Sequence, residues 1–164
     1  MWKKIFVFGL TLLAALFLIT GCGTDIGIPE EDIYSADAQV VVGDLVWEIV
    51  EVEDRGVETV SAYTGPIERR ILGVTFKIEN KSNDPKTLVD ITMIDDNGNR
   101  YPICLEAFGS FDFDQVCVLQ EIPPGAEKTY SAAFAVPTDA NRAILEVTDL
   151  GGPALEYGYI ELGI

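Results

Sequence analysis

The residue types that carry most enzyme chemistry are scarce or unpatterned in this chain. It contains no histidine, which removes the commonest general base and the commonest transition-metal ligand. It has no Gly-x-Ser-x-Gly or Ser-x-x-Lys motif for a serine nucleophile, and no glycine-rich phosphate-binding motif. The 27 acidic residues offer many carboxylate pairs of the kind that hydrolyses glycosidic bonds, and no pair stands out. We therefore assign no catalytic residue, no metal site and no cofactor, which leaves cysteine as the residue type with assignable chemistry.

Cys22 stands at the end of a leader that is typical of export. Lys3 and Lys4 precede an apolar run over residues 5–19, and Thr20-Gly21 supplies a small-residue exit. Residues 19–22 (Ile-Thr-Gly-Cys) resemble the lipobox of bacterial lipoproteins, in which cleavage falls before the cysteine and its thiol carries diacylglycerol. We expect a signal peptide over residues 1–21 and a lipid on Cys22 that anchors the protein to a membrane in the bacterial cell envelope, outside the cytoplasm. The alternative is an uncleaved helix, although residues 5–21 fall short of the roughly 20 apolar residues that a span needs.

Cys104 and Cys117 form an even pair once Cys22 is assigned to lipid. Disulfides persist outside the cytoplasm, so this pair is predicted to close a short loop. In the chain-entropy model such a bridge contributes about 3 kcal/mol when its geometry is unstrained. Two buried free thiols are the alternative.

The length and charge limit the remaining possibilities. Removal of residues 1–21 from the 164-residue chain leaves enough for one domain with a core of ordinary size. The net charge is −16 although the leader carries two lysines and no acid, so the mature part is still more acidic. Such a chain repels nucleic acid, and we expect no nucleic-acid partner.

The residues after the leader have the composition of a linker. Residues 23–38 (GTDIGIPEEDIYSADA) show neither helical nor strand periodicity and contain several acids. We therefore expect a flexible acidic tether over residues 22–38, which joins the lipid to a domain over residues 39–164.

The rest of the chain has the period-two pattern of strands. In residues 69–80 the apolar side chains alternate with more polar ones and predict one buried face, formed by Leu72, Val74, Phe76 and Ile78. Similar patterns cover residues 45–53, 87–95, 128–136, 143–149 and 157–162, the last as a candidate edge strand. Residues 96–99 (Asp-Asn-Gly-Asn) predict a hairpin with a type I′ turn rather than a calcium-binding loop. Seven to nine short strands separated by turn signals predict an all-β fold, an immunoglobulin-like β-sandwich.

The segment between the two later cysteines is the candidate contact loop. Residues 106–115 contain three aromatic and three acidic side chains, and five of these are close together in the sequence, at Phe108, Phe111, Asp112, Phe113 and Asp114. Exposed aromatics on a rigid loop are typical of contact surfaces. The alternative, which we favour, is that the rings cover the open end of the sandwich core. The two aspartates are also candidates for holding a hard cation, although nothing in their spacing requires it.

Several short motifs resemble, in order and spacing, a widespread domain of bacterial lipoproteins and secreted proteins. They are residues 43–47 (GDLVW), 74–82 (VTFKIENKS), 94–101 (IDDNGNRY), 122–125 (IPPG) and 134–137 (FAVP). Members of that family are described as telokin-like, immunoprotective-antigen-like immunoglobulin folds. The resemblance covers about residues 39–149 and implies an extracellular β-sandwich of undefined role. It transfers no catalytic residue, and the cysteine pair at 104 and 117 is not part of it.

These observations lead to one functional expectation and two alternatives. We expect a lipid-anchored, non-enzymatic module that binds an envelope protein or a small ligand. The alternatives are a carboxylate-based envelope enzyme and a purely structural spacer domain.

Overall fold

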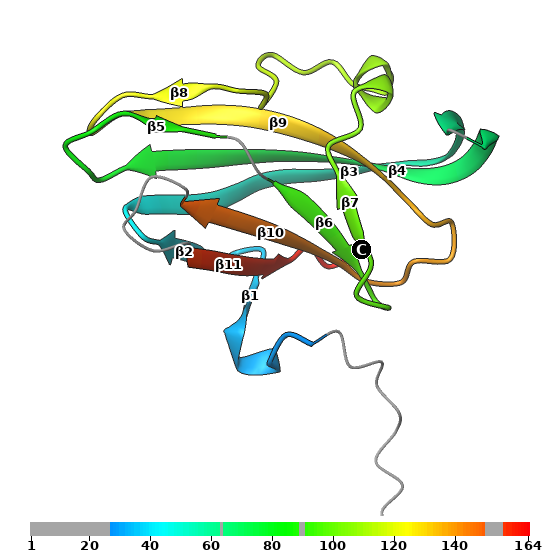
Figure 1. Cartoon of the computed structure of the whole chain (residues 1–164), viewed down its shortest axis with the longest axis horizontal. Coiled ribbons are helices and arrows are strands. Elements are labelled where there is room, and N and C mark those ends of the chain that lie inside the picture. Colours follow the sequence, from blue (N-terminus) through cyan, green and yellow to red (C-terminus); the bar gives the residue numbers. More distant parts are fainter. Residues whose placement is uncertain (1–26, 63, 89–90, 150–155) are drawn as a thin grey trace, which may run out of the picture.

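Two β-sheets pack face to face in the computed structural model, which describes residues 27–62, 64–88, 91–149 and 156–164 (Figure 1). The four-stranded sheet has the order β2 (Gln39–Val42), β3 (Leu45–Ala62), β4 (Gly65–Asn80) and β9 (Glu127–Val136). The five-stranded sheet has the order β1 (Ile33–Ser35), β11 (Glu156–Glu161), β10 (Ala143–Asp149), β6 (Thr92–Asp95) and β7 (Arg100–Pro102). A third, two-stranded sheet joins β5 (Lys86–Thr87) to β8 (Glu121–Ile122), and two short 3₁₀ helices are η1 (Glu30–Asp32) and η2 (Glu106–Ser110). The predicted β-sandwich is confirmed, with more strands than expected.

The predicted alternation produces the core. Leu72, Val74, Phe76 and Ile78 of β4 are each fully buried and join one hydrophobic cluster with residues of the facing sheet, among them Met93, Leu145 and Ile160. The opposite side of β4 carries the residues between them, including Gly73 and Thr75, and forms the outer face of the four-stranded sheet. Because side chains alternate along a strand, this one stretch supplies both a core wall and an outer surface.

The last strand and the central hairpin differ from the sequence prediction. β11 lies between β10 and β1, so it is not an edge strand. Residues 57–62 and 65–66, which carry no clear pattern, extend β3 and β4 as a long hairpin arm beyond the rest of the sheet (Figure 1). The local sequence of these residues does not predict the arm.

The hairpin between β6 and β7 is confirmed, but its predicted turn type is wrong. The Asp95 carbonyl accepts a hydrogen bond from the Gly98 amide at 3.0 Å, and the Asp95 carboxylate accepts the amides of Asn97 and Asn99 at 2.9 Å. A type I′ turn requires positive φ at both central residues, whereas Gly98 has φ of 76° and Asn97 does not have a positive φ. The buried carboxylate of Asp95 therefore organises the turn, together with a hydrogen bond from the Tyr101 hydroxyl at 2.8 Å.

The segment before β2 packs on the sandwich, so the predicted tether is wrong for residues 28–35. Ile28 is buried against Ile144 on the outer face of the five-stranded sheet, and β1 pairs in parallel with β11. The Arg142 guanidinium, 2.9 Å from the Glu30 carboxylate, ties the same segment down. A local pattern could not reveal this docking, because the apolar surface that receives Ile28 is made by distant strands.

A buried ion pair joins the two sheets at one end. The Lys86 ammonium lies 2.9 Å from Oδ1 and 2.8 Å from Oδ2 of Asp149, and 3.1 Å from Oδ2 of Asp44. Asp149 Oδ2 also accepts the Asp44 amide at 2.9 Å. Gly43 leaves space for this carboxylate, because a Cβ there would lie 2.5 Å from Asp149 Oδ2. The Gly-Asp motif at 43–44 is thus structural.

The predicted signal helix and Cys22 lie outside the described residues. Within the described ranges, no helix has the length and apolar character to cross a membrane. The core between the two sheets is formed by residues 40–162 of the described part of the chain.

Candidate functional site

The three phenylalanines of the candidate contact loop lie against the outer face of the four-stranded sheet. Phe111 stacks on Phe113 with ring centroids 4.7 Å apart, and Phe108 meets Phe113 edge-on at 5.9 Å. Phe111 also covers Gly73 of β4, where a Cβ would lie 2.4 Å from its ring. The rings are half-buried in a second cluster around Ile71, so they neither cover the open end of the sandwich nor stand free in solvent.

Backbone hydrogen bonds hold both ends of this loop on the free edge of β9. The Cys104 amide donates to the Ala133 carbonyl, the Ser131 amide donates to the Gln115 carbonyl and the Cys117 amide donates to the Ser131 carbonyl, each at 2.8 Å. These bonds satisfy part of an edge that would otherwise be open to another chain. They also set the position of the acidic residues between the two ends.

The predicted disulfide between Cys104 and Cys117 is wrong, since both thiols are free in the structure. Cys104 is half-buried in the outer cluster with the phenylalanines, whereas Cys117 is 2% exposed in the core between the sheets. The four-stranded sheet thus separates the two side chains. Burial raises the pKa of the Cys117 thiol to about 12, which keeps it protonated and inert at neutral pH. The alternative of two free thiols is the one observed, although only Cys117 is fully buried.

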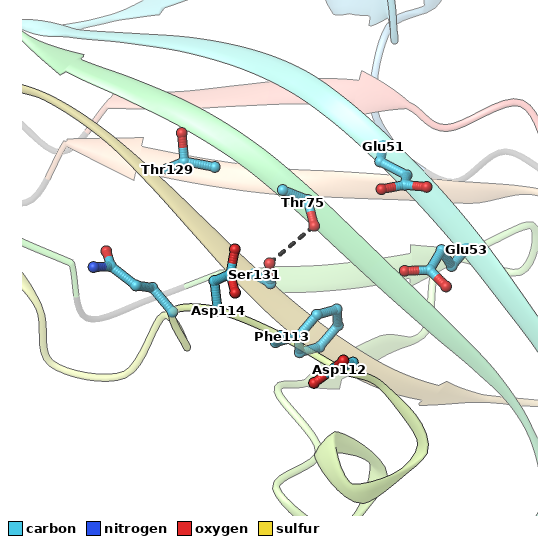
Figure 2. Close-up of a pocket in the computed structure, with 9 residues that line it drawn as sticks. Glu51, Glu53, Thr75, Asp112, Phe113, Asp114, Thr129 and Ser131 are labelled. Carbon is cyan, nitrogen blue, oxygen red and sulfur yellow. Dashed lines mark hydrogen bonds between the residues drawn. The ribbon is translucent and has the colours of Figure 1, made fainter.

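The loop and the sheet together enclose a pocket of about 440 Å³ (Figure 2). β3 contributes Glu51 and Glu53, and the loop contributes Asp112 and Asp114 from the other side. Between them lie an aromatic ring, an amide and three hydroxyls, from Phe113, Gln115, Thr75, Thr129 and Ser131. The hydroxyls of Thr75 and Ser131 are 2.9 Å apart and hydrogen-bonded across β4 and β9. The pocket is therefore polar and acidic, with one apolar wall.

A break in register puts the two glutamates in the pocket. Ile49 pairs with Phe76 on the core face of β4, but Glu51 pairs with its neighbour Thr75, so Val50 is an extra residue in β3. Such a bulge reverses the side-chain phase of the strand that contains it. Glu51 and Glu53 consequently share the outer face, where strict alternation from Ile49 would have directed them into the core.

The charges of the pocket are largely unbalanced. Within the described ranges, the one ion pair to a lining acid joins Arg55 Nη2 to Glu53 Oε2 at 2.7 Å. The same guanidinium lies 5.1 Å from the Phe111 ring centroid, which fixes it at the margin of the pocket. No group of three or more described residues is arranged to hold a metal ion. The arrangement is suited to hydrogen-bond donors and positive charge on a ligand.

Sequence reasoning found part of this site. Asp112, Phe113 and Asp114 of the candidate contact loop line the pocket. Phe108 and Phe111 do not line it and instead pack against Phe113. The residues from β3, β4 and β9 were missed. The hydroxyls at Thr75 and Ser131 alternate with core residues and looked like ordinary outward positions, and the glutamates depend on the bulge.

Comparison with known proteins identifies the fold. No known protein family and no curated protein matches the sequence. The yjhA protein from Bacillus subtilis has a similar structure, with a TM-score of 0.58 at 13% identity over 79% of this chain and 99% of that chain. A candidate lipoprotein, ycdA from Bacillus subtilis, gives a TM-score of 0.57 at 12% identity over 77% of this chain and 38% of that chain. A secreted protein from Mycobacterium tuberculosis gives a TM-score of 0.50 at 13% identity over 80% of this chain and 96% of that chain. At these identities the similarity shows a shared β-sandwich fold.

Proposed function

We propose that this protein is a lipid-anchored binding module of the cell envelope and that its acidic pocket receives a positively charged group of the ligand. The observation that carries the proposal is the pocket formed by Glu51, Glu53, Asp112 and Asp114. Four carboxylates beside one partly neutralising arginine attract cations, and an aromatic wall adds a favourable surface for an ammonium or guanidinium group. The hydroxyls and the amide then supply neutral hydrogen-bonding positions that orient the ligand.

The packing of Ile28 limits how far a lipid anchor at Cys22 could stand from the domain. Residues 23–27 separate Cys22 from Ile28, which packs on the five-stranded sheet, so the chain between them can span at most about 22 Å. The pocket lies on the outer face of the opposite, four-stranded sheet. A protein anchored in this way presents its pocket away from the membrane, where a ligand has access.

The names of similar structures agree with this location. One is a candidate lipoprotein and another a secreted protein. Together with the leader and the resemblance to telokin-like, immunoprotective-antigen-like domains, they support a site outside the cytoplasm. The anchor is tested by the intact mass of the protein extracted from membranes, which reports cleavage before Cys22 and the added lipid.

Binding is tested with tetralysine as the probe and residues 27–164 as the protein, by isothermal titration at low salt. The variant Glu51→Gln/Glu53→Gln removes two charges from the pocket. The matched control Glu68→Gln/Glu121→Gln removes two from elsewhere on the surface. We expect the pocket variant to bind about tenfold more weakly than the control. Equal affinities in the two variants would show that the probe responds only to net charge.

One observation keeps a carboxylate-based enzyme as the second candidate. Glu53 on β3 and Asp112 on the loop line the same pocket from two sides, as paired acids in glycosidases do. Release of reducing sugars from purified cell-wall glycan, abolished by Glu51→Gln/Glu53→Gln, would favour this enzyme. Tetralysine binding without such release favours the binding module, and the absence of both favours a spacer.

A further inference from the structure

A second pocket, of about 410 Å³, opens between the hairpin arm of β3 and β4 and the segment that follows β7. Its walls are mainly apolar, formed by Val60, Ile67, Ile103 and Ala135. The thiol-bearing Cys104 also lines it. Its volume and composition fall in the range of small-molecule sites. It is lined by different residues from the acidic pocket and is not used by the proposed function.

The charge of this pocket is opposite to that of the protein. The chain has 27 acidic and 11 basic residues, yet no carboxylate lines the pocket and Arg69 is its one charged residue. Because no lining carboxylate neutralises Arg69, the pocket is locally positive and favours an anion over a cation, against the negative field of the whole protein.

Arg69 also lacks the partner that the other arginines have. Each of the other described arginines forms an ion pair with a carboxylate, namely Arg55, Arg70, Arg100 and Arg142. Arg69 forms none with any described residue. Its cross-strand neighbour is Glu58, whose carboxylate accepts the Ser110 hydroxyl at 2.7 Å. The Arg69 guanidinium is therefore available to an anion from outside.

We propose that this pocket binds an amphiphilic anion of the fatty-carboxylate class. The apolar tail lies against Val60, Ile67 and Ile103, and the carboxylate accepts hydrogen bonds from Arg69. A guanidinium matches a carboxylate with two parallel hydrogen bonds, which makes this head group a better partner than a neutral alcohol. The tail supplies most of the binding free energy through burial, and the head group supplies selectivity.

Cys104 provides a direct readout. Residues 27–164 are incubated with iodoacetamide, with and without dodecanoate below its micellar concentration, and alkylation is followed at the peptide level. A bound tail covers the Cys104 thiol, so its alkylation should slow about tenfold at saturation, since the free fraction is then small. Cys117, 2% exposed, is an internal reference that should stay unmodified while the protein is folded.

The head-group contact is tested with a neutral ligand and a matched variant. Dodecanol should protect Cys104 only at about tenfold higher concentration than dodecanoate, because it forms no charge-assisted pair. Arg69→Gln should remove this preference, whereas Arg100→Gln, which changes an ion-paired arginine on the other sheet, should keep it. No protection of Cys104 by dodecanoate, or equal protection by both ligands in the unaltered protein, would overturn the proposal. Loss of tetralysine binding alone would not affect it.

Discussion

Replacement of Lys86 by methionine tests whether the buried ion pair holds the two sheets together. Lys86 is 5% exposed and Asp149 is 1% exposed, so the substitution leaves a carboxylate in the interior without its ammonium partner. Methionine keeps most of the length of the lysine side chain, so lost packing is a small part of the effect. Burial alone lowers the pKa of Lys86, but the hydrogen bonds and charges of Asp149 and Asp44 outweigh it and raise that pKa. The lysine is therefore charged at neutral pH, and its removal breaks a true ion pair.

The expected loss of stability is about 3 kcal/mol, at the lower end of the range for breaking a buried pair, because Asp149 retains the Asp44 amide at 2.9 Å. The free energy of unfolding of residues 27–164 is measured by urea titration. Trp47 is the one tryptophan in this part of the chain and is fully buried, so its fluorescence reports unfolding. A loss of this size moves the urea midpoint by about 1–3 M.

Two further variants make the test specific. Lys81→Met is the same substitution at an exposed ion pair with Glu79 and should change stability by less than about 1 kcal/mol. Lys86→Met/Asp149→Asn also removes the charge of the buried carboxylate and should restore much of the lost free energy of unfolding. The reasoning is refuted if Lys86→Met unfolds at the same urea concentration as Lys81→Met, or if the double variant is no more stable than the single one.

Tyr101, Gly43 and the two later cysteines offer three further tests. Burial first, and then the hydrogen bond and charge of Asp95, raise the pKa of Tyr101 to about 12. Its neutral form therefore adds stability below the unfolded pKa of about 10, and this stability is lost as the pH rises towards about 12. The free energy of unfolding, measured by urea titration, should fall less between about pH 9 and pH 12 for Tyr101→Phe than for the unaltered protein. An equal fall in both proteins would contradict the raised pKa of Tyr101. Gly43→Ala should cost about 1–3 kcal/mol, because φ is +57° and the new Cβ meets a buried carboxylate, and an unchanged melting temperature would exclude that clash. Iodoacetamide should modify both Cys104 and Cys117 after the protein is unfolded without reductant. An intact mass two hydrogens below that of the reduced chain would show instead that the two cysteines form a disulfide.

Part of the fold follows from local sequence. The alternation in residues 69–80 is enough to place Leu72, Val74 and Phe76 in a core, because a strand directs successive side chains to opposite faces. Likewise Asn97-Gly98 marks a hairpin whichever turn type it adopts, because a glycine accepts the positive φ that the reversal needs. These features depend on neighbours within a few residues.

The candidate site depends on contacts that local sequence does not contain. Glu51 reaches the outer face because the register of β3 against β4 shifts at Val50, and that shift belongs to the pair of strands. Asp112 and Asp114 meet it because the loop carrying them docks on the edge of β9 and lays Phe111 on Gly73.

The three cysteines show the same division. Their number and the residues before Cys22 are enough to predict an export leader and a lipid site, because those signals are read along a linear segment. Parity also suggested a bridge between Cys104 and Cys117, but a disulfide requires Cα atoms within about 7 Å of each other and side chains that point towards each other. Only the packing of the loop against β9 decides that one thiol lies in the core and the other on the outer face. Sequence thus determined the class of fold, while tertiary contacts decided which side chains meet, because those contacts join residues far apart along the chain.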